Sequence, residues 1–232
     1  MGTWGDGLLD SDGALDCAGE VTEWLEAQAA LLVDSPATEV AAARLAALMG
    51  LLLHLSPYSF ESPRSWPALR DALEQQHRAY AALSPEAATL MRQLLHGAGK
   101  ELGARRGERS GEFLQALGGY LDGVLEPCLL AHEAAGALVQ EVAGVCADML
   151  DVRLTGDLDL YESADAMGAF ALLLLLPPCR LEGARLKRWH GFMREARRRT
   201  GAEGTGNPDI EFFDRYMVNV ELAFRLARAR FV

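Results

Sequence analysis

Residues 166–176 read Ala-Met-Gly-Ala-Phe-Ala-Leu-Leu-Leu-Leu-Leu, and Pro177-Pro178 follow directly. No charged side chain interrupts this run, so a helix built from it is apolar on every side. The run is far shorter than the roughly 20 apolar residues that a membrane span requires. It is therefore typical of a helix buried at the centre of a helical bundle, with Ser163 as its N-cap and the two prolines at its end.

The segments on both sides of this run repeat apolar residues every three or four positions, a spacing that predicts amphipathic helices. We expect Asp10, Ser11 and Asp12 to supply capping oxygens for the first helix, and Ser35-Pro36 to begin the second. The most regular stripe belongs to the last helix and consists of Phe213, Met217, Val220, Phe224, Ala227 and Phe231. The sequence thus predicts an all-α protein of about eight helices.

Two segments depart from this helical pattern. Residues 152–160 alternate apolar and polar side chains around Gly156-Asp157, which suits either a small β-hairpin or an irregular loop. Residues 103–110 are polar and mark a soft internal boundary, but the pattern is helical on both sides of it. We therefore expect residues 1–232 to form a single helical domain.

The N-terminal segment is the most specific motif of the chain. It reads Met1-Gly2-Thr3-Trp4-Gly5-Asp6-Gly7 and continues with Asp10-Ser11-Asp12. Over about its first 28 residues the chain resembles an uncharacterised bacterial family of unknown function that opens Met-Gly-x-Trp-Gly-x-Gly, although Leu9 and Ser11 replace the usual Phe and Asn. The resemblance implies a helical, cytosolic bacterial protein. It implies no catalytic residues, because the family has no established activity.

The charge and cysteine patterns indicate compartment and partner. The net charge is −11, and residues 1–43 carry nine acids without a single Lys or Arg, so the positive region of a secretory signal is missing. Four cysteines lack metal-like spacing and are expected to be reduced thiols, which favours the cytoplasm. The negative charge disfavours nucleic acid as a partner.

No catalytic motif is present, and the sequence predicts no cofactor. The leading hypothesis is therefore a non-enzymatic protein-binding module, more narrowly an immunity or antitoxin-like protein that masks a basic toxin or effector. Complementary charge speeds and directs such association. The acids expected to form the binding surface are Asp6, Asp10, Asp12, Asp16, Glu20 and Glu23.

Two alternatives remain open. Asp157, Asp159, Glu162 and Asp165 could hold a hard cation such as Mg²⁺ or Ca²⁺ in a helical enzyme, or they could simply favour a helix N-terminus. A small-ligand pocket could instead lie between helices, lined by three aromatic residues: Trp66, Tyr80 and Trp189. Arginines at 105–109 and 194–199 could bind phosphate, but pairing with acids of the same chain is the favoured interpretation.

Overall fold

A computed structural model describes residues 7–9, 11–55, 82, 133–177, 179–202 and 210–232 of the chain. Its regular elements are all helices, which confirms the all-α class for this part of the chain. The helices predicted between residues 67 and 124, and the boundary at 103–110, lie outside the described residues. The described helices are α1 (Asp12–Val33), α2 (Glu39–Leu55), α7 (Glu133–Arg153), α8 (Leu160–Leu175), α9 (Gly183–Ala202) and α10 (Ile210–Phe231).

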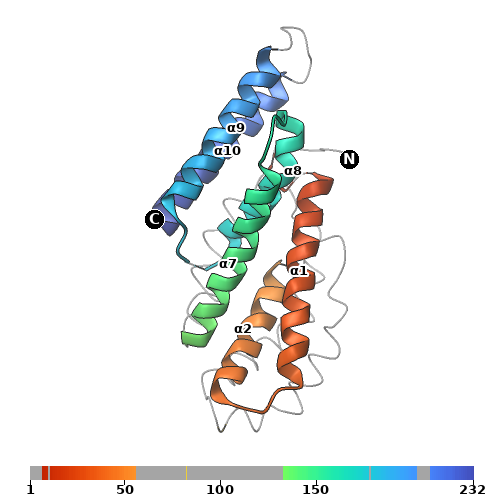
Figure 1. Ribbon diagram of the computed structural model, residues 1–232, viewed down its shortest axis with the longest axis vertical. Coiled ribbons are helices and arrows are strands. Elements are labelled where there is room, and N and C mark those ends of the chain that lie inside the picture. The colour runs from red at the N-terminus through yellow and green to blue at the C-terminus, as the bar shows by residue number, and fades with distance from the viewer. Residues whose placement is uncertain (1–6, 10, 56–81, 83–132, 178, 203–209) are drawn as a thin grey trace.

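Helix α8 lies at the centre of the described helices. It contacts α1 and α7 on one side and α9 and α10 on another, while α2 joins α1 to α7 (Figure 1). Every residue from Ala166 to Leu176 is buried, as the apolar run predicts. The helix ends at Leu175 just before Pro177, because a proline cannot continue the hydrogen-bond ladder. Among the described residues, no helix has the length and apolar character that crossing a membrane would require.

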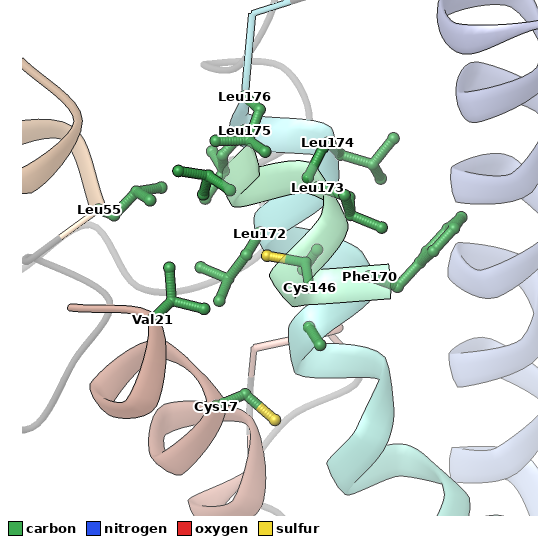
Figure 2. Close-up of a cluster of buried hydrophobic side chains, with 14 of the residues drawn as sticks. Cys17, Val21, Leu55, Cys146, Phe170, Leu172, Leu173, Leu174, Leu175 and Leu176 are labelled. Carbon is green, nitrogen blue, oxygen red and sulfur yellow. The ribbon is translucent and has the colours of Figure 1, made fainter. Parts of the chain in front are cut away.

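The side chains of α8 connect two groups of helices. Figure 2 shows Leu172 directed toward Val21 of α1, whereas Phe170 points to the opposite side. There the Phe170 ring lies 4.3 Å from that of Phe224 on α10 and 6.2 Å from that of Trp189 on α9, measured between ring centroids. Burial of such rings contributes strongly to stability. Helix α8 therefore holds the α9–α10 pair against the bundle of α1, α2 and α7.

Helices α1 and α8 approach each other closely at a glycine. A Cβ atom added to Gly168 would lie 2.4 Å from the Cα of Ala14 and 2.9 Å from its carbonyl oxygen. Both are backbone atoms, so neither can move aside without shifting the helix. Gly168 thus sets the distance between the two helices, and the small Ala14 completes the contact.

The start of α8 differs from the expectation that Ser163 is its cap. Asp159 is the N-cap, since its Oδ1 accepts a hydrogen bond from the Glu162 backbone N–H at 2.8 Å. Glu162 Oε2 in turn accepts from the Asp159 N–H at 3.0 Å, which completes a capping box. The helix begins one turn earlier than predicted because Leu160 is fully buried and belongs to the core. Ser163 instead donates its hydroxyl to the Asp159 carbonyl at 2.6 Å.

The alternation at 152–160 reflects a loop, and the hairpin prediction is wrong. Helix α7 continues to Arg153, and the segment from Leu154 to Asp159 contains no strand. Leu154 and Leu160 are both buried, so these leucines anchor the loop between α7 and α8 in the core. Gly156 turns the chain with a φ of 74°, a conformation that favours glycine.

Capping residues were predicted for the first two helices, and one of the two predictions is confirmed. Ser11 caps α1 as predicted, because its Oγ accepts from the Ala14 N–H at 3.1 Å. The predicted start of α2 at Ser35-Pro36 is wrong, since α2 begins at Glu39. Thr38 provides the capping oxygen there and accepts from the Ala41 N–H at 3.1 Å. Ser35 lies at the end of α1 and donates its hydroxyl to the Leu31 carbonyl at 2.8 Å.

Candidate functional site

The predicted acidic surface is partly assembled on α1. Asp16, Glu20 and Glu23 are exposed and share one side of the helix, opposite the residues that pack against α8 and α2. Asp12 is half-buried in the first turn. Asp6 and Asp10 lie outside the described residues. Helix geometry therefore places three of the six predicted acids together.

One of these three acids already has a partner within the chain. Glu20 forms an ion pair with Arg153, the last residue of α7. No cation among the described residues lies within ion-pair distance of Asp16 or Glu23. The acidic charge that α1 presents to a partner thus rests mainly on these two side chains.

Many other charges pair within the chain, as predicted for the arginine cluster at 194–199. Arg197 pairs with Asp214, Arg198 with Glu195, and Arg199 with Asp157. The cluster at 105–109 lies outside the described residues. In the described part of the chain, the basic C-terminal third therefore largely neutralises acids of the same molecule.

A cluster of these interactions joins α7 to α9 at Asp151. Its carboxylate pairs with Arg185 at 3.2 Å and with Arg188, and Oδ1 accepts a hydrogen bond from Trp189 Nε1 at 2.6 Å. Partial burial acts to raise the pKa of Asp151, but the hydrogen bonds from Arg188 and Trp189 and the charge of Arg185 outweigh it. The pKa of Asp151 is consequently below its ordinary value, and the group stays ionised at neutral pH.

Three of the four carboxylates of the predicted metal site are engaged in local structural contacts. Asp159 and Glu162 are engaged with each other's backbone in the capping box, and Asp157 pairs with Arg199 at 3.3 Å. Asp165 lies one turn further along α8, where its carbonyl accepts from the Cys17 thiol at 3.5 Å. No group of three or more His, Cys, Asp or Glu residues in the described ranges is arranged to hold a metal ion.

Two further candidates for chemistry are also packed structural groups. Trp189, predicted to line a ligand pocket, is buried against Phe170 and held by Asp151, while Trp66 and Tyr80 lie outside the described residues. Cys17, Cys146 and Cys179 are free thiols. Burial raises the pKa of Cys17 and of Cys179 to about 11, so both stay protonated and poorly nucleophilic at neutral pH.

A groove on the surface of α9 and α10 is the feature that the sequence analysis missed. Its volume is about 500 Å³, and it is open on one side. Apolar side chains of α10 and charged side chains of both helices line it: Arg194, Arg197, Asp214, Met217, Val218, Glu221, Leu222 and Arg225. Val218 is 67% exposed, Leu222 42% and Leu226 39%. The groove therefore combines an exposed apolar stripe with charges of both signs.

The stripe is a second apolar side of α10. The predicted core stripe is confirmed for five of its six residues, since Phe213, Val220, Phe224, Ala227 and Phe231 are buried. The sixth, Met217, is half-buried and lines the groove. Val218, Leu222 and Leu226 recur at intervals of four residues on another side of the same helix. A search for two stripes on one helix, instead of the single most regular one, would have found this surface.

The polar wall of the groove is held by contacts to α9. Glu221 Oε1 lies 2.9 Å from His190 Nε2 and 3.9 Å from Arg194 Nε. Arg228 contacts the other ring nitrogen of His190, Nδ1, at 2.9 Å. A guanidinium can only donate, so Nδ1 accepts this hydrogen bond. The charged group of α9 nearest to the Glu221 carboxylate is thus Arg194.

Comparison with protein-family models, with curated proteins and with solved structures finds no match for this chain. The functional argument therefore rests on the geometry of the described residues alone. The resemblance of residues 1–28 to an uncharacterised family stays a prediction.

Proposed function

We propose that this protein is a non-enzymatic protein-binding module that docks a helix of another chain in the α9–α10 groove. The observation that carries the proposal is the exposed stripe of Val218, Leu222 and Leu226. Contiguous exposed apolar side chains with a polar rim are typical of protein-binding surfaces. The stripe belongs to a helix whose other side already supplies the core, so folding alone does not explain it.

The shape and charge of the groove favour a helical occupant. A channel between two parallel ridges accepts the side chains of a third helix at intervals of three and four residues. Arg225 on the rim can pair with an acid of that helix, whereas the other charges of the rim already pair within the chain, Arg197 with Asp214 and Arg194 with Glu221. The chemistry of the groove is thus that of a protein interface, with an apolar floor and charged edges.

The proposal can be tested by site-specific photo-crosslinking of the full chain in cells. A benzophenone amino acid replaces Leu222 in one variant and Val152 in a matched control, because Val152 is 74% exposed and does not line the groove. We expect a discrete protein adduct from position 222 and none of the same mass from position 152. The absence of any adduct from position 222, or identical adducts from both positions, would overturn the proposal.

The acidic side of α1 supports a second, narrower proposal, in which an immunity or antitoxin-like protein of the cytoplasm masks a basic toxin or effector. The specific observation is that Asp16 and Glu23 are exposed without a cation of the described residues nearby. Complementary charge accelerates such an encounter and makes it sensitive to salt.

Affinity capture tests this second proposal with the double variant Asp16→Asn, Glu23→Gln and the control Glu133→Gln, which removes an exposed acid at the start of α7. We expect the wild type and the control to retain one basic protein that the double variant loses, and purified components to reproduce this binding. Retention by all three forms, or by none, would contradict it.

A further inference from the structure

We infer that the occupant of the α9–α10 groove is a second copy of this chain, bound with the two α10 helices antiparallel across a twofold axis near Leu222. The inference rests on the proposed function of the groove and names its partner. It goes beyond that proposal, because a homodimer needs no other gene product.

The spacing of the exposed stripe is the first argument. Val218 precedes Leu222 by four residues, and Leu226 follows it by four. The stripe is therefore symmetric about Leu222: an inverted copy places Val218 opposite Leu226, Leu222 opposite itself, and Leu226 opposite Val218. A twofold interface requires such self-complementarity, since the same patch must serve both partners.

The distribution of charge along α10 is the second argument. Asp214 and Glu221 lie before Leu222 together with one cation, Arg215, whereas three arginines and no acid lie after it: Arg225, Arg228 and Arg230. Antiparallel pairing brings the acidic half of each helix toward the basic half of the other, while parallel pairing would set the arginines against one another. Opposite charges at the edges of paired helices select the orientation of the partner.

The groove carries charges of both signs, which also favours a second copy of the chain over a partner that is strongly acidic or strongly basic. The groove is lined by Arg194, Arg197 and Arg225 together with Asp214 and Glu221. A strongly acidic or strongly basic helix would leave some of these charges facing like charge. Glu221, nearest to the twofold axis, lies 3.9 Å from the guanidinium of Arg194, which offsets part of its repulsion from its own copy.

The strength of the association follows from the extent of the stripe. Val218 to Leu226 spans only about 12 Å of helix. An interface built around it belongs to the small, weakly bound class and should dissociate at roughly micromolar concentration. We therefore expect a reversible dimer whose population depends on protein concentration.

Sedimentation of the full chain measures this directly. The mass should rise from 25.1 kDa toward about twice that value as concentration increases through roughly 1 to 100 μM. Leu222→Glu should weaken association at least about tenfold, because two introduced carboxylates would meet at the axis. The matched control Leu31→Glu, at a leucine of α1 that is 66% exposed, should associate like the wild type.

Cysteine crosslinking tests the orientation. Under mild oxidation Leu222→Cys should form a covalent dimer, and a mixture of Val218→Cys with Leu226→Cys should form a mixed one. Val218→Cys alone should form no covalent dimer, and neither should the wild type, whose native thiols provide the baseline. Parallel pairing would give the opposite result, a covalent dimer from Val218→Cys alone.

The outcomes separate this inference from the proposed function. A mass of one chain at every concentration, or efficient crosslinking of Val218→Cys to itself, would overturn the antiparallel dimer. If position 222 then still gives a photo-adduct with a different protein, the groove remains a protein-binding site. If it gives none, both the dimer and the proposed function are wrong.

Discussion

Helices α8 and α10 are both rich in apolar residues, but the fold covers them to different extents. Every side chain from Ala166 to Leu176 in and after α8 is buried. Helix α10 buries one stripe, headed by Phe213, and leaves Val218, Leu222 and Leu226 exposed. Within the described part of the chain, the apolar surface of α8 is fully covered, whereas that of α10 is covered on one side only. The uncovered side is the basis of the proposed binding role.

The largest expected effect comes from removing a ring where α8 meets α9 and α10. Phe170→Ala should lower the free energy of unfolding by about 3 to 5 kcal/mol, because it leaves a cavity beside Phe224 and Trp189. Urea unfolding followed by circular dichroism provides the measurement. The conservative variant Phe170→Leu should lose less. An equally small loss for both would show that this junction is not tightly packed.

A smaller effect is expected where α8 meets α1. Gly168→Ala should destabilise the protein by about 1 to 3 kcal/mol, since the added methyl group meets the backbone of Ala14. Gly144→Ala is a matched control, because open space surrounds that position on α7. The control should be neutral or stabilising by up to about 1 kcal/mol through helix propensity. Thermal unfolding of both variants provides the measurement. Equal shifts of the melting temperature in the two variants would contradict the close contact at Gly168.

The interactions of Asp151 between α7 and α9 predict that the free energy of unfolding depends on pH. The pKa of Asp151 is lowered in the folded protein, so its interactions stabilise the fold above the unfolded pKa of roughly 3.9. This contribution is lost as the pH falls through the lower, folded-state pKa. Asp151→Asn should therefore flatten the acid limb of the stability profile.

The same residue offers a test at neutral pH. Asp151→Ala should cost about 1 to 3 kcal/mol, because the indole N–H of Trp189 loses its acceptor. Asp151→Asn retains an oxygen for that N–H and should lose less. Chemical unfolding at pH 7 ranks the two variants. Equal losses would show that charge, and not the Trp189 hydrogen bond, is what matters there.

The smallest effect on stability is expected on the exposed side of α10. Leu222→Glu should change the free energy of unfolding of the monomer by less than about 0.5 kcal/mol, as is usual for partly exposed positions. Unfolding of dilute protein checks this, because the groove is then unoccupied by a second copy. A loss as large as that of Phe170→Ala would mean that the stripe is part of the core.

Local patterns predicted the helices better than their ends. The stripe of Leu186, Trp189, Met193 and Ala196 in α9 is buried as expected, and so is the stripe from Phe213 to Phe231 in α10 except for the half-buried Met217. The cap of α8 and the start of α2 were misplaced by a few residues, because serine, threonine and aspartate compete as capping groups. The choice among them depends on which neighbouring residue is buried, and this is decided by the other helices.

The candidate site was less predictable than the fold. The acids on α1 could be grouped from helix periodicity, but the pairing of Glu20 with Arg153 joins residues far apart in the chain. The carboxylates at 157–165 looked like a set of metal ligands, whereas the structure uses Asp159 and Glu162 as a capping box. A carboxylate has the same chemistry in either role, and only its neighbours determine which one it serves.

The amino-acid sequence by itself determined that the described segments are helical and that residues 166–176 lie at the centre of their core, because an all-apolar run that lies among amphipathic helical segments and ends at proline suits a buried helix. The tertiary structure decided which apolar side of α10 is covered. A helix with two stripes can bury either one, and the rings of Phe170 and Trp189 on neighbouring helices match the stripe of Phe224. Val218, Leu222 and Leu226 were left on the surface as a result.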